Sequence, residues 1–313
     1  MKIGDAAALH YHVALFPDSR NWRISGAMIE FVKMHGLGND FIILDARGRN
    51  DFTVPPAAAR AMADRRRGIG CDQLLIIRDS DTADIQMDIL NHDGSPSGAC
   101  GNGTRCVADY VMQKTEQTKL SIATDGGLLS AEYDARFGQT LVAVDMGPAH
   151  TAWQDVPLAK DCDTLAIDLG IGVPPVACHS MGNPHAVAFV DDVSSIDLNA
   201  IGPIAEMHEL FPERVNFSIV EKRDDGVFRM RVWERGVGIT MACGSGACAV
   251  GVAVNRRGLG GRLNEIVMDG GSVHIEWVDD GTAGGRVILV GPVAYSYAGS
   301  LSPELANMLV SAQ

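Results

Sequence analysis

Residues 99–108 read "ACGNGTRCVA", and residues 242–251 read "ACGSGACAVG". In both stretches a cysteine precedes Gly-Asn/Ser-Gly and a run of small and apolar residues, which predicts a buried helix that begins just after the cysteine. Unpaired backbone N–H groups give the N-terminus of a helix a partial positive charge. Such groups stabilise a thiolate and bind a carboxylate. We therefore expect two reactive cysteines, each with a pKa that falls from about 8.5 toward neutrality.

The two cysteine turns belong to a longer internal repeat. Cys100 and Cys243 are 143 positions apart. The same offset, within one residue, relates three further polar pairs beside strand-like runs: Asn39 with Asn183, Gln73 with Asn216, and Asn91 with Glu234. Several matches at one offset indicate a duplicated domain. Polar residues at strand ends and in turns are where functional sites are usually built.

The local patterns predict the same elements in both halves. Short apolar or alternating runs predict strands in the first half, at 30–34, 73–77, 84–90, 119–124, 128–134 and 140–146. Residues 55–68 and 197–210 read as helices, and a second helix follows each cysteine. The sequence therefore predicts an α+β fold of two pseudo-symmetric domains from an internal duplication, each a curved, mostly antiparallel sheet wrapped around a central helix.

The domain boundaries follow from the repeat. We place the first domain at residues 28–146 and the second at 147–289, and residues 290–313 return a strand to the first domain. Residues 1–27 form a leader outside both domains, predicted to be a disordered or non-conserved extension. Its apolar patch is interrupted by polar residues and fits a secretory signal poorly.

Composition excludes several classes of function. The net charge of −13 argues against a nucleic-acid partner, which would need a basic surface. The sequence has no apolar run near the ~20 residues of a membrane span, so we expect no membrane partner. The seven cysteines are an odd number without disulfide-framework spacing. With no secretory signal, this favours free thiols in a cytoplasmic protein.

Two cysteine turns that face each other would place one sulfur on each side of a bound carbon atom. One thiolate removes a proton from one face, and the opposite thiol delivers a proton to the other face. Helix N-termini that hold a carboxylate stabilise the charge of the carbanion. This predicts racemisation or epimerisation next to a carboxylate, with no cofactor and no metal.

Six sequence blocks resemble the diaminopimelate epimerase family: "FVKMHGLGNDFIILD" (31–45), "GCDQLL" (70–75), "NHDGSPSGACGNGTRC" (91–106), "MGNPHAV" (181–187), "ERVNF" (213–217) and "WERGVGITMACGSGACA" (233–249). The resemblance implies a pyridoxal-independent isomerase that interconverts LL- and meso-2,6-diaminopimelate, in lysine and peptidoglycan precursor biosynthesis. It also implies two domains that close over the substrate, and a homodimer.

The resemblance assigns roles to residues of this chain. Cys100 and Cys243 are implied as the acid–base thiols, with His185 nearby, and Glu234 as a further catalytic residue. The substrate-binding residues it implies are Asn39, Gln73, Asn91, Gly101, Asn102, Asn183, Asn216, Glu234, Arg235, Gly244 and Ser245. Gly101, Asn102, Gly244 and Ser245 correspond to the backbone amides at the reacting carboxylate, and Glu234 and Arg235 to the charged pair for the far end. Tyr297 corresponds to a dimer contact.

Three alternative functions each match part of the sequence. A proline or hydroxyproline racemase would keep two facing thiols but lack the charged pair of "WERG" (233–236). A thiol-redox protein usually has Cys-x-x-Cys, a spacing that neither Cys100 nor Cys243 has. A zinc-binding module would need a compact four-ligand cluster, which the spacing of cysteines and histidines does not provide.

Overall fold

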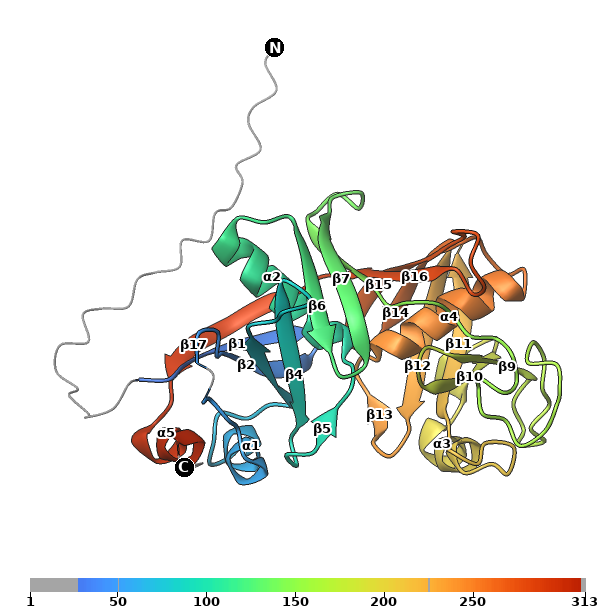
Figure 1. The fold of residues 1–313 in the computed structure, drawn as a ribbon. Coiled ribbons are helices and arrows are strands. Elements are labelled where there is room, and N and C mark those ends of the chain that lie inside the picture. Colours follow the sequence, from blue (N-terminus) through green and yellow to red (C-terminus); the bar gives the residue numbers. More distant parts are fainter. Residues whose placement is uncertain (1–27, 50, 225, 311–313) are drawn as a thin grey trace, which may run out of the picture.

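The structure is a computed structural model that describes residues 28–49, 51–224 and 226–310. One series of strands and helices occurs twice along the chain (Figure 1). The first series is β1 (Glu30–Gly36), β2 (Asn39–Asp45), α1 (Pro56–Ala63), β3 (Gln73–Arg78), β4 (Ile85–Asn91), β5 (Pro96–Ser97), α2 (Gly101–Thr115), β6 (Lys119–Thr124), β7 (Gly127–Asp134) and β8 (Leu141–Asp145).

The second series repeats this order, with one short 3₁₀ helix inserted. It consists of β9 (Val176–Ser180), β10 (Pro184–Phe189), η1 (Val193–Ser195), α3 (Leu198–Glu206), β11 (Asn216–Asp224), β12 (Val227–Glu234), β13 (Gly238–Thr240), α4 (Gly244–Arg256), β14 (Leu263–Met268), β15 (Gly271–Val278) and β16 (Arg286–Gly291). A last strand, β17 (Ala294–Ser300), and helix α5 (Pro303–Val310) follow. The duplication seen in the sequence is therefore a duplication of structure.

Strand pairing is the same in both halves. In the first half β2 pairs with β3, and β4 with β6, in parallel, while the other strands pair antiparallel. In the second half β10–β11 and β12–β14 are the corresponding parallel pairs. The predicted fold class, two α+β halves with mostly antiparallel sheets, is confirmed.

A helix lies inside the curve of each sheet. Every residue of α2 from Gly101 to Met112 is buried. Helix α4 is buried on all sides over most of its length. A Cβ built on its Gly251 would lie only 2.5 Å from Cγ2 of Ile275 on β15. Glycine and alanine let α4 approach the sheet this closely. The prediction of a central helix in each half is confirmed.

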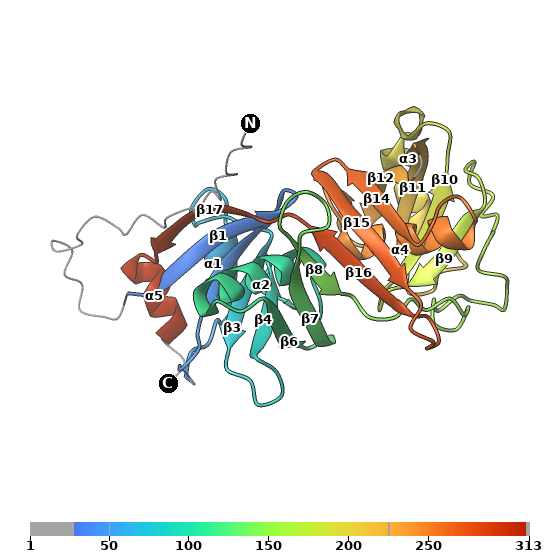
Figure 2. The ribbon, with the colours of Figure 1, turned by 90° about the horizontal axis from the view of Figure 1, so that it is seen from above.

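The two halves are joined by sheet pairing. β8 pairs antiparallel with β16, so one continuous sheet crosses from the first half to the second. β17 then runs back along the first half and pairs antiparallel with β1 (Figure 2). Its residues are mostly exposed, and it carries Tyr295 and Tyr297 with about half of each side chain accessible, 47% and 50%. Helix α5 packs beside α1.

The predicted helix at 55–68 is too long. Helix α1 ends at Ala63, and the basic run 65–67 forms a turn instead of the last turn of the helix. Asp64 is the cause, because its backbone is extended and its carboxylate accepts hydrogen bonds from the N–H groups of Arg66 and Arg67. The helix predicted at 197–210 likewise ends early, at Glu206.

Two further predictions concern the limits of the chain. The predicted leader, residues 1–27, lies outside the described residues. The boundaries 28–146 and 147–289 stay a prediction. None of the helices in the described part of the chain is long and apolar enough to cross a membrane.

Candidate active site

Cys100 caps the N-terminus of α2. Its backbone is extended, and its Sγ accepts a hydrogen bond from the N–H of Gly103 at 3.3 Å. Glycine is needed at position 103, because a Cβ there would lie 3.1 Å from the side chain of Leu75 and 3.4 Å from the sulfur. The small residues of "CGNG" therefore allow the sulfur to rest against the first turn of the helix.

Cys243 occupies the same place at the N-terminus of α4. It is buried, with 5% of its surface exposed, and its Sγ lies 3.7 Å from Oγ of Ser245. A Cβ on Gly246 would lie 3.2 Å from this sulfur and 2.8 Å from Cε of Met230. The two cysteines thus have equivalent positions, as the repeat predicts.

An asparagine from the strand hairpin of each half contacts the residues after each cysteine. In the first half, Oδ1 of Asn39 accepts from Nδ2 of Asn102 at 3.2 Å and from the Cys100 thiol at 3.8 Å. In the second half, Nδ2 of Asn183 donates to Oγ of Ser245 at 3.4 Å. The offset that relates these residues in sequence therefore also relates their contacts.

The N-termini of α2 and α4 lie next to each other. A Cβ built on Gly244, the first residue of α4, would lie 3.6 Å from Oδ1 and 3.8 Å from the backbone nitrogen of Asn102. Gly101, Asn102, Gly244 and Ser245 fill the first two positions of the two helices, where N–H groups have no acceptor within the helix. The two cysteine turns therefore share one location, between the halves of the molecule.

Glu234, at the end of β12, is close to both thiols. Its charge raises the pKa of Cys100 and that of Cys243. Its Oε1 accepts a hydrogen bond from the hydroxyl of Thr240 on β13. Burial raises the pKa of the Glu234 carboxyl, and the negative charge of Asp72 raises it further.

The expectation of thiol pKa values near neutrality is wrong for this structure. Burial raises the pKa of Cys100 to about 11, although the N–H of Gly103 and the charge of Arg105 act to lower it. Burial and Glu234 raise the pKa of Cys243 well above its usual value. The helix N-terminus favours the thiolate, but loss of hydration has the larger effect.

The remaining predicted residues of the second half form two hydrogen-bonded sets, one around Asn216 and one around Asn183. Oδ1 of Asn216 accepts from the backbone N–H of Arg235 at 3.0 Å, and its Nδ2 donates to the carbonyl of Pro184 at 2.9 Å. Nε2 of His185 lies 3.0 Å from Oδ1 of Asn183. Burial, with a smaller effect of Arg235, lowers the pKa of His185 to about 3, so this imidazole is neutral near pH 7. The guanidinium of Arg235 donates to the carbonyl of Glu213.

In the first half, Gln73 and Asn91 form a pair on neighbouring strands. Nε2 of Gln73 donates to Oδ1 of Asn91 at 3.0 Å, and Nδ2 of Asn91 donates to Oγ of Ser95. Asp72, next to Gln73, accepts from Nδ2 of Asn39 at 2.8 Å. These contacts connect the Gln73–Asn91 pair with the group around Cys100.

Sequence reasoning missed three residues of this group. They are Asp72, which orients Asn39; Thr240, which donates to Glu234; and Arg105, which donates to Asn102 at 2.9 Å. The repeat offers a signal for one of them, since Thr240 stands 143 positions after Ser97 and both are the last residues of short strands, β13 and β5. Asp72 and Arg105 have no polar counterpart at that offset, where Val215 and Cys248 stand.

Tyr297 does not belong to this group. Its hydroxyl lies 3.5 Å from the carbonyl of Ile69, and its ring packs edge-to-face on Phe31. Among the residues that the structure describes, no group of three or more His, Cys, Asp or Glu is placed to hold a metal ion.

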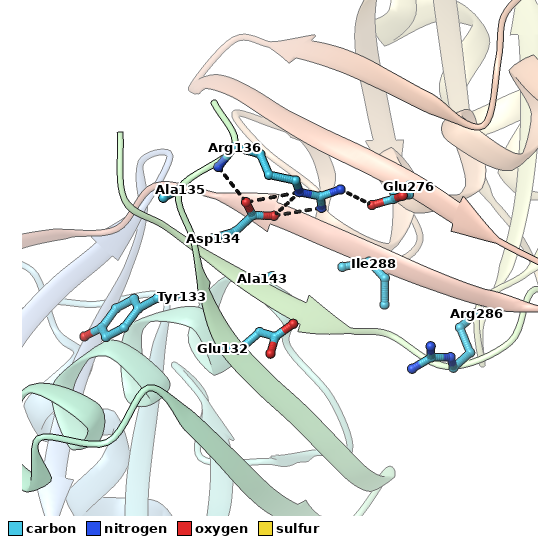
Figure 3. A pocket seen from close by; sticks show the side chains of 9 residues that line it. All are labelled: Glu132, Tyr133, Asp134, Ala135, Arg136, Ala143, Glu276, Arg286 and Ile288. Atoms are coloured by element: carbon cyan, nitrogen blue, oxygen red, sulfur yellow. Dashed lines mark hydrogen bonds and ion pairs between the residues drawn. The ribbon is translucent and has the colours of Figure 1, made fainter. Parts of the chain in front are cut away.

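A surface hollow of about 440 Å³ lies elsewhere, against strands β7, β8, β15 and β16 (Figure 3). Charged side chains line it, among them Glu132, Arg136, Glu276 and Arg286. Arg136 connects the halves there, because it pairs with Asp134 of β7 and with Glu276 of β15. None of the predicted site residues lines this hollow, so we place the site at the two cysteines.

The geometry around the cysteines suits proton transfer at a carbon next to a carboxylate. Two thiols on two helices border one location, with N–H groups for an anion and with carboxamides that donate and accept. Glu234 adds a carboxylate close to both thiols.

Comparison with known proteins gives one family. A family model described as diaminopimelate epimerase matches residues 31–152 and 177–295. A diaminopimelate epimerase of Acidiphilium cryptum is 50% identical over 277 residues, which cover 88% of this chain and 97% of that protein. One from Rhodospirillum centenum is 49% identical over 278 residues, with 88% and 93% covered.

Solved structures share the fold at low sequence identity. A PhzF-family phenazine biosynthesis protein of Bacillus anthracis matches with a TM-score of 0.63 at 15% identity, over 88% of this chain and 99% of that one. A hydroxyproline epimerase of Agrobacterium vitis matches with a TM-score of 0.58 at 14% identity, over 88% and 91%. These two likenesses concern the fold alone.

Proposed function

The chain belongs to the diaminopimelate epimerase family, and from this membership we propose that Cys100 and Cys243 invert one α-carbon of diaminopimelate by a two-thiol mechanism. As a member of the family, the protein is an isomerase that interconverts LL- and meso-2,6-diaminopimelate, in the biosynthesis of lysine and of peptidoglycan precursors. The observation that carries the proposed mechanism is the pair of equivalent cysteines at two adjacent helix N-termini.

In the proposed mechanism, each cysteine works on one face of the α-carbon. The thiolate of one cysteine removes the α-proton and becomes a thiol, and the electron pair of the C–H bond moves into the substrate carboxylate group. The opposite thiol then gives its proton to the other face and becomes a thiolate. The reverse reaction uses the same residues in exchanged roles, so each cysteine is base in one direction and acid in the other.

The helix N-termini stabilise the charge that develops in this step. We assign the backbone N–H groups of Gly101, Asn102, Gly244 and Ser245 to the carboxylate at the reacting carbon. As the proton leaves, negative charge grows on the carboxylate oxygens, and fixed N–H dipoles stabilise it without having to reorient. Losing one such donor costs about 10²- to 10³-fold in rate in other enzymes.

The substrate itself assists ionisation of a thiol. Both thiols have raised pKa values because burial and Glu234 disfavour the thiolate. Diaminopimelate carries two ammonium groups, and a cation beside a thiol lowers the thiol pKa. An ammonium group that pairs with Glu234 would also remove the repulsion between this carboxylate and the thiolates.

The far end of the substrate pairs with polar side chains. We propose that Arg235 forms two parallel hydrogen bonds with the distal carboxylate. The carboxamides of Asn39, Gln73, Asn91, Asn183 and Asn216 complete the lining, and His185 holds Asn183 in place through its Nε2. Buried charges are costly unless they are paired, so the full set of partners selects a substrate with two charged ends.

The test of this function is turnover of LL-diaminopimelate in deuterated water by the wild-type protein, Cys100→Ser and Cys243→Ser. We expect product of the first turnovers to carry solvent deuterium at one α-carbon, and each serine variant to lose nearly all activity. L-Proline, assayed alongside, should remain unchanged because it lacks the second charged end. A serine variant with most of the wild-type rate, or product that keeps its original hydrogen, would contradict the two-thiol mechanism.

We further propose a homodimer and a cytoplasmic location. Support for the dimer comes from β17, whose exposed face carries Tyr295 and Tyr297. Support for the cytoplasm comes from the seven cysteines, all of which are free in the structure. Free thiols are typical of a reducing compartment.

A further inference from the structure

Arg105, on the second turn of α2, is buried completely, with 0% of its surface exposed. Its Nη2 donates to Oδ1 of Asn102 at 2.9 Å, and its Nη1 lies 3.5 Å from the carbonyl of Gly101. Its Nε is buried and has no hydrogen-bond partner. Within the described residues, no carboxylate forms an ion pair with Arg105. The guanidinium charge is therefore buried without an acidic partner.

A buried charge of this kind is costly. Removing an ion from water costs several kcal/mol even after the protein relaxes, and a partner of opposite charge is what normally offsets this cost. Burial lowers the pKa of Arg105, but a guanidinium stays protonated near neutral pH. The groups whose negative forms act on it are thiols: Cys106, Cys100 and Cys248.

Glycines from both halves form the slot that holds the guanidinium. A Cβ on Gly36, at the end of β1, would lie 3.2 Å from Nη2 of Arg105. A Cβ on Gly291, at the end of β16, would lie 3.2 Å from Nε and 3.3 Å from Cζ. Since side chains at either position would displace the guanidinium, its place at the junction of the halves is specified by the backbone on two sides.

Only the first half of the repeat has a positively charged residue at this position. The residue 143 positions after Arg105 is Cys248, on the same turn of α4, and the charge of Arg105 lowers the pKa of that thiol. A second arginine at 248 would bring two buried cations together. The single guanidinium therefore serves both helix N-termini, whose first residues Asn102 and Gly244 lie side by side.

Arg105 also determines how two carboxamides are turned. A guanidinium only donates hydrogen bonds, so Asn102 must present Oδ1 to it and Nδ2 to Asn39. Asn39 then presents Oδ1 to Asn102 and to the thiol of Cys100, while its Nδ2 donates to Asp72. The chain of contacts runs from the guanidinium to the catalytic sulfur without a break.

We propose that Arg105 is a positioning residue with two effects. It supplies a fixed positive charge next to the two cysteine turns. Its hydrogen bond to Asn102 also orients Asn102 and Asn39 toward Cys100. The negative charges that pair with Arg105 arise during the reaction. They are the Cys100 thiolate and the substrate carboxylate. This inference rests on the proposed function, because it takes Cys100 as a thiolate during turnover.

The experiment compares Arg105→Met, Arg105→Lys and a control, Arg78→Met. Arg78 is a partly buried arginine of the same half that pairs with Asp88 on β4, away from the cysteine turns. The first readout is the rate at which iodoacetamide alkylates Cys100 without substrate, followed by mass spectrometry of its peptide between pH 7 and 11. The second is kcat and KM with LL-diaminopimelate. Circular dichroism reports whether each variant is folded.

Loss of the charge should make the Cys100 thiolate rarer. At pH 9, below the pKa of about 11, we expect Arg105→Met to slow alkylation by roughly tenfold, equivalent to one pKa unit. Arg105→Lys keeps the positive charge but loses the parallel N–H donors of the planar guanidinium. Its alkylation profile should therefore stay near that of wild type, while its kcat/KM falls roughly tenfold. Arg78→Met should match wild type in both readouts. We expect kcat/KM of Arg105→Met to fall by about 100-fold.

A folded Arg105→Met variant with the wild-type alkylation profile would overturn the proposal. Should the methionine variant not fold, Arg105→Lys decides, and wild-type values of both kcat/KM and alkylation there would overturn it equally. Alkylation is measured without turnover, so its result tests the role of Arg105 independently of the proposed two-thiol mechanism. Should Cys100→Ser retain epimerisation, the two-thiol mechanism fails, whatever the alkylation of Arg105→Met.

Discussion

Single residues at the site experience opposing physical effects. Cys100 and Cys243 lie at helix N-termini, which favour the thiolate, but Cys100 is partly buried and Cys243 is buried, and burial favours the neutral thiol. Burial has the larger effect in both, and Glu234 adds to it. The pKa of each thiol is therefore raised, and an ammonium group of the substrate near either thiol would lower it.

Thr240 stabilises the charged form of Glu234, and a hydrogen bond with Cys243 adds to this effect. The hydroxyl of Thr240 donates to Oε1 of Glu234 and thereby lowers the pKa of that carboxyl. Thr240→Val keeps the shape and removes the donor. We expect kcat/KM for LL-diaminopimelate to fall by roughly 10- to 100-fold, because a hydrogen bond to a charged group is worth about 1.5–3 kcal/mol. Steady-state kinetics at pH 7.5 measures this.

Thr115→Val is the matched control for this prediction. The hydroxyl of Thr115 donates to the carbonyl of Val111 at the far end of α2, so its loss should leave kcat/KM at the wild-type value. Equal kinetic constants in Thr240→Val and Thr115→Val would contradict a role of Thr240 in binding.

At the scale of elements, β9 and β10 bring two histidines into the interior. His179 and His185 are opposite each other in the β9–β10 register, and each has 0% of its surface exposed. Burial lowers the pKa of each to about 3. Neither nitrogen of His179 has a hydrogen-bond partner. Both rings are therefore neutral in the folded protein near pH 7.

This arrangement predicts that acid destabilises the protein through these strands. Between pH 6.5 and about 3 the unfolded chain binds a proton at each histidine and the folded chain does not, so stability falls as pH falls. Each histidine contributes about 1.4 kcal/mol per pH unit in this window. We expect the free energy of unfolding of His179→Leu, measured in urea, to rise relative to that of wild type as the pH falls from 6 to 4.5. The expected rise is about 1.4 kcal/mol per pH unit.

His92→Leu provides the comparison for this pH series. His92 is exposed in the turn after β4, so its removal should leave the pH slope of stability parallel to that of wild type. If the free energy of unfolding of His179→Leu also ran parallel to that of wild type across this pH range, His179 would not be buried as a neutral group.

At the scale of the whole molecule, the two halves are held in one body by sheet pairing and by side-chain contacts across their junction. The β8–β16 ladder continues the sheet across the junction. On its outer side, Arg136 pairs with Glu276, and Phe137 stacks on His274 with ring centroids 3.7 Å apart. Both helix N-termini are oriented by this junction, because α2 and α4 pack inside the two sheets that it joins.

The proposed dimer is tested at the exposed face of β17. Tyr297→Asp places a charge in the proposed contact, where burying it would cost several kcal/mol, so we expect a monomer in sedimentation velocity where wild type is a dimer. Leu128→Asp is the control, since Leu128 is 66% exposed on β7, and it should sediment as wild type does. A wild-type monomer, or a dimer of unchanged affinity in Tyr297→Asp, would contradict this contact.

Several features of the fold and site were predictable because they are local or repeated. Strand periodicity, the prolines at the start of α1 and the small residues of α4 depend on neighbours in the chain. The offset of 143 related Cys100 to Cys243 and Asn39 to Asn183, because duplicated domains retain equivalent positions. The end of α1 was missed because the Asp64 carboxylate, a single side chain, competes with the helix there.

The sequence by itself determined that two equivalent cysteine turns exist, that each begins a buried helix, and which polar residues repeat with them. Only the tertiary structure decided that burial outweighs the helix dipole at the thiols, since hydration depends on everything packed around an atom. It also decided that Arg105, which in sequence resembles any surface cation, is enclosed by glycines of two distant strands. The physical reason is that desolvation and charge pairing depend on distances in space, which the order of residues does not contain.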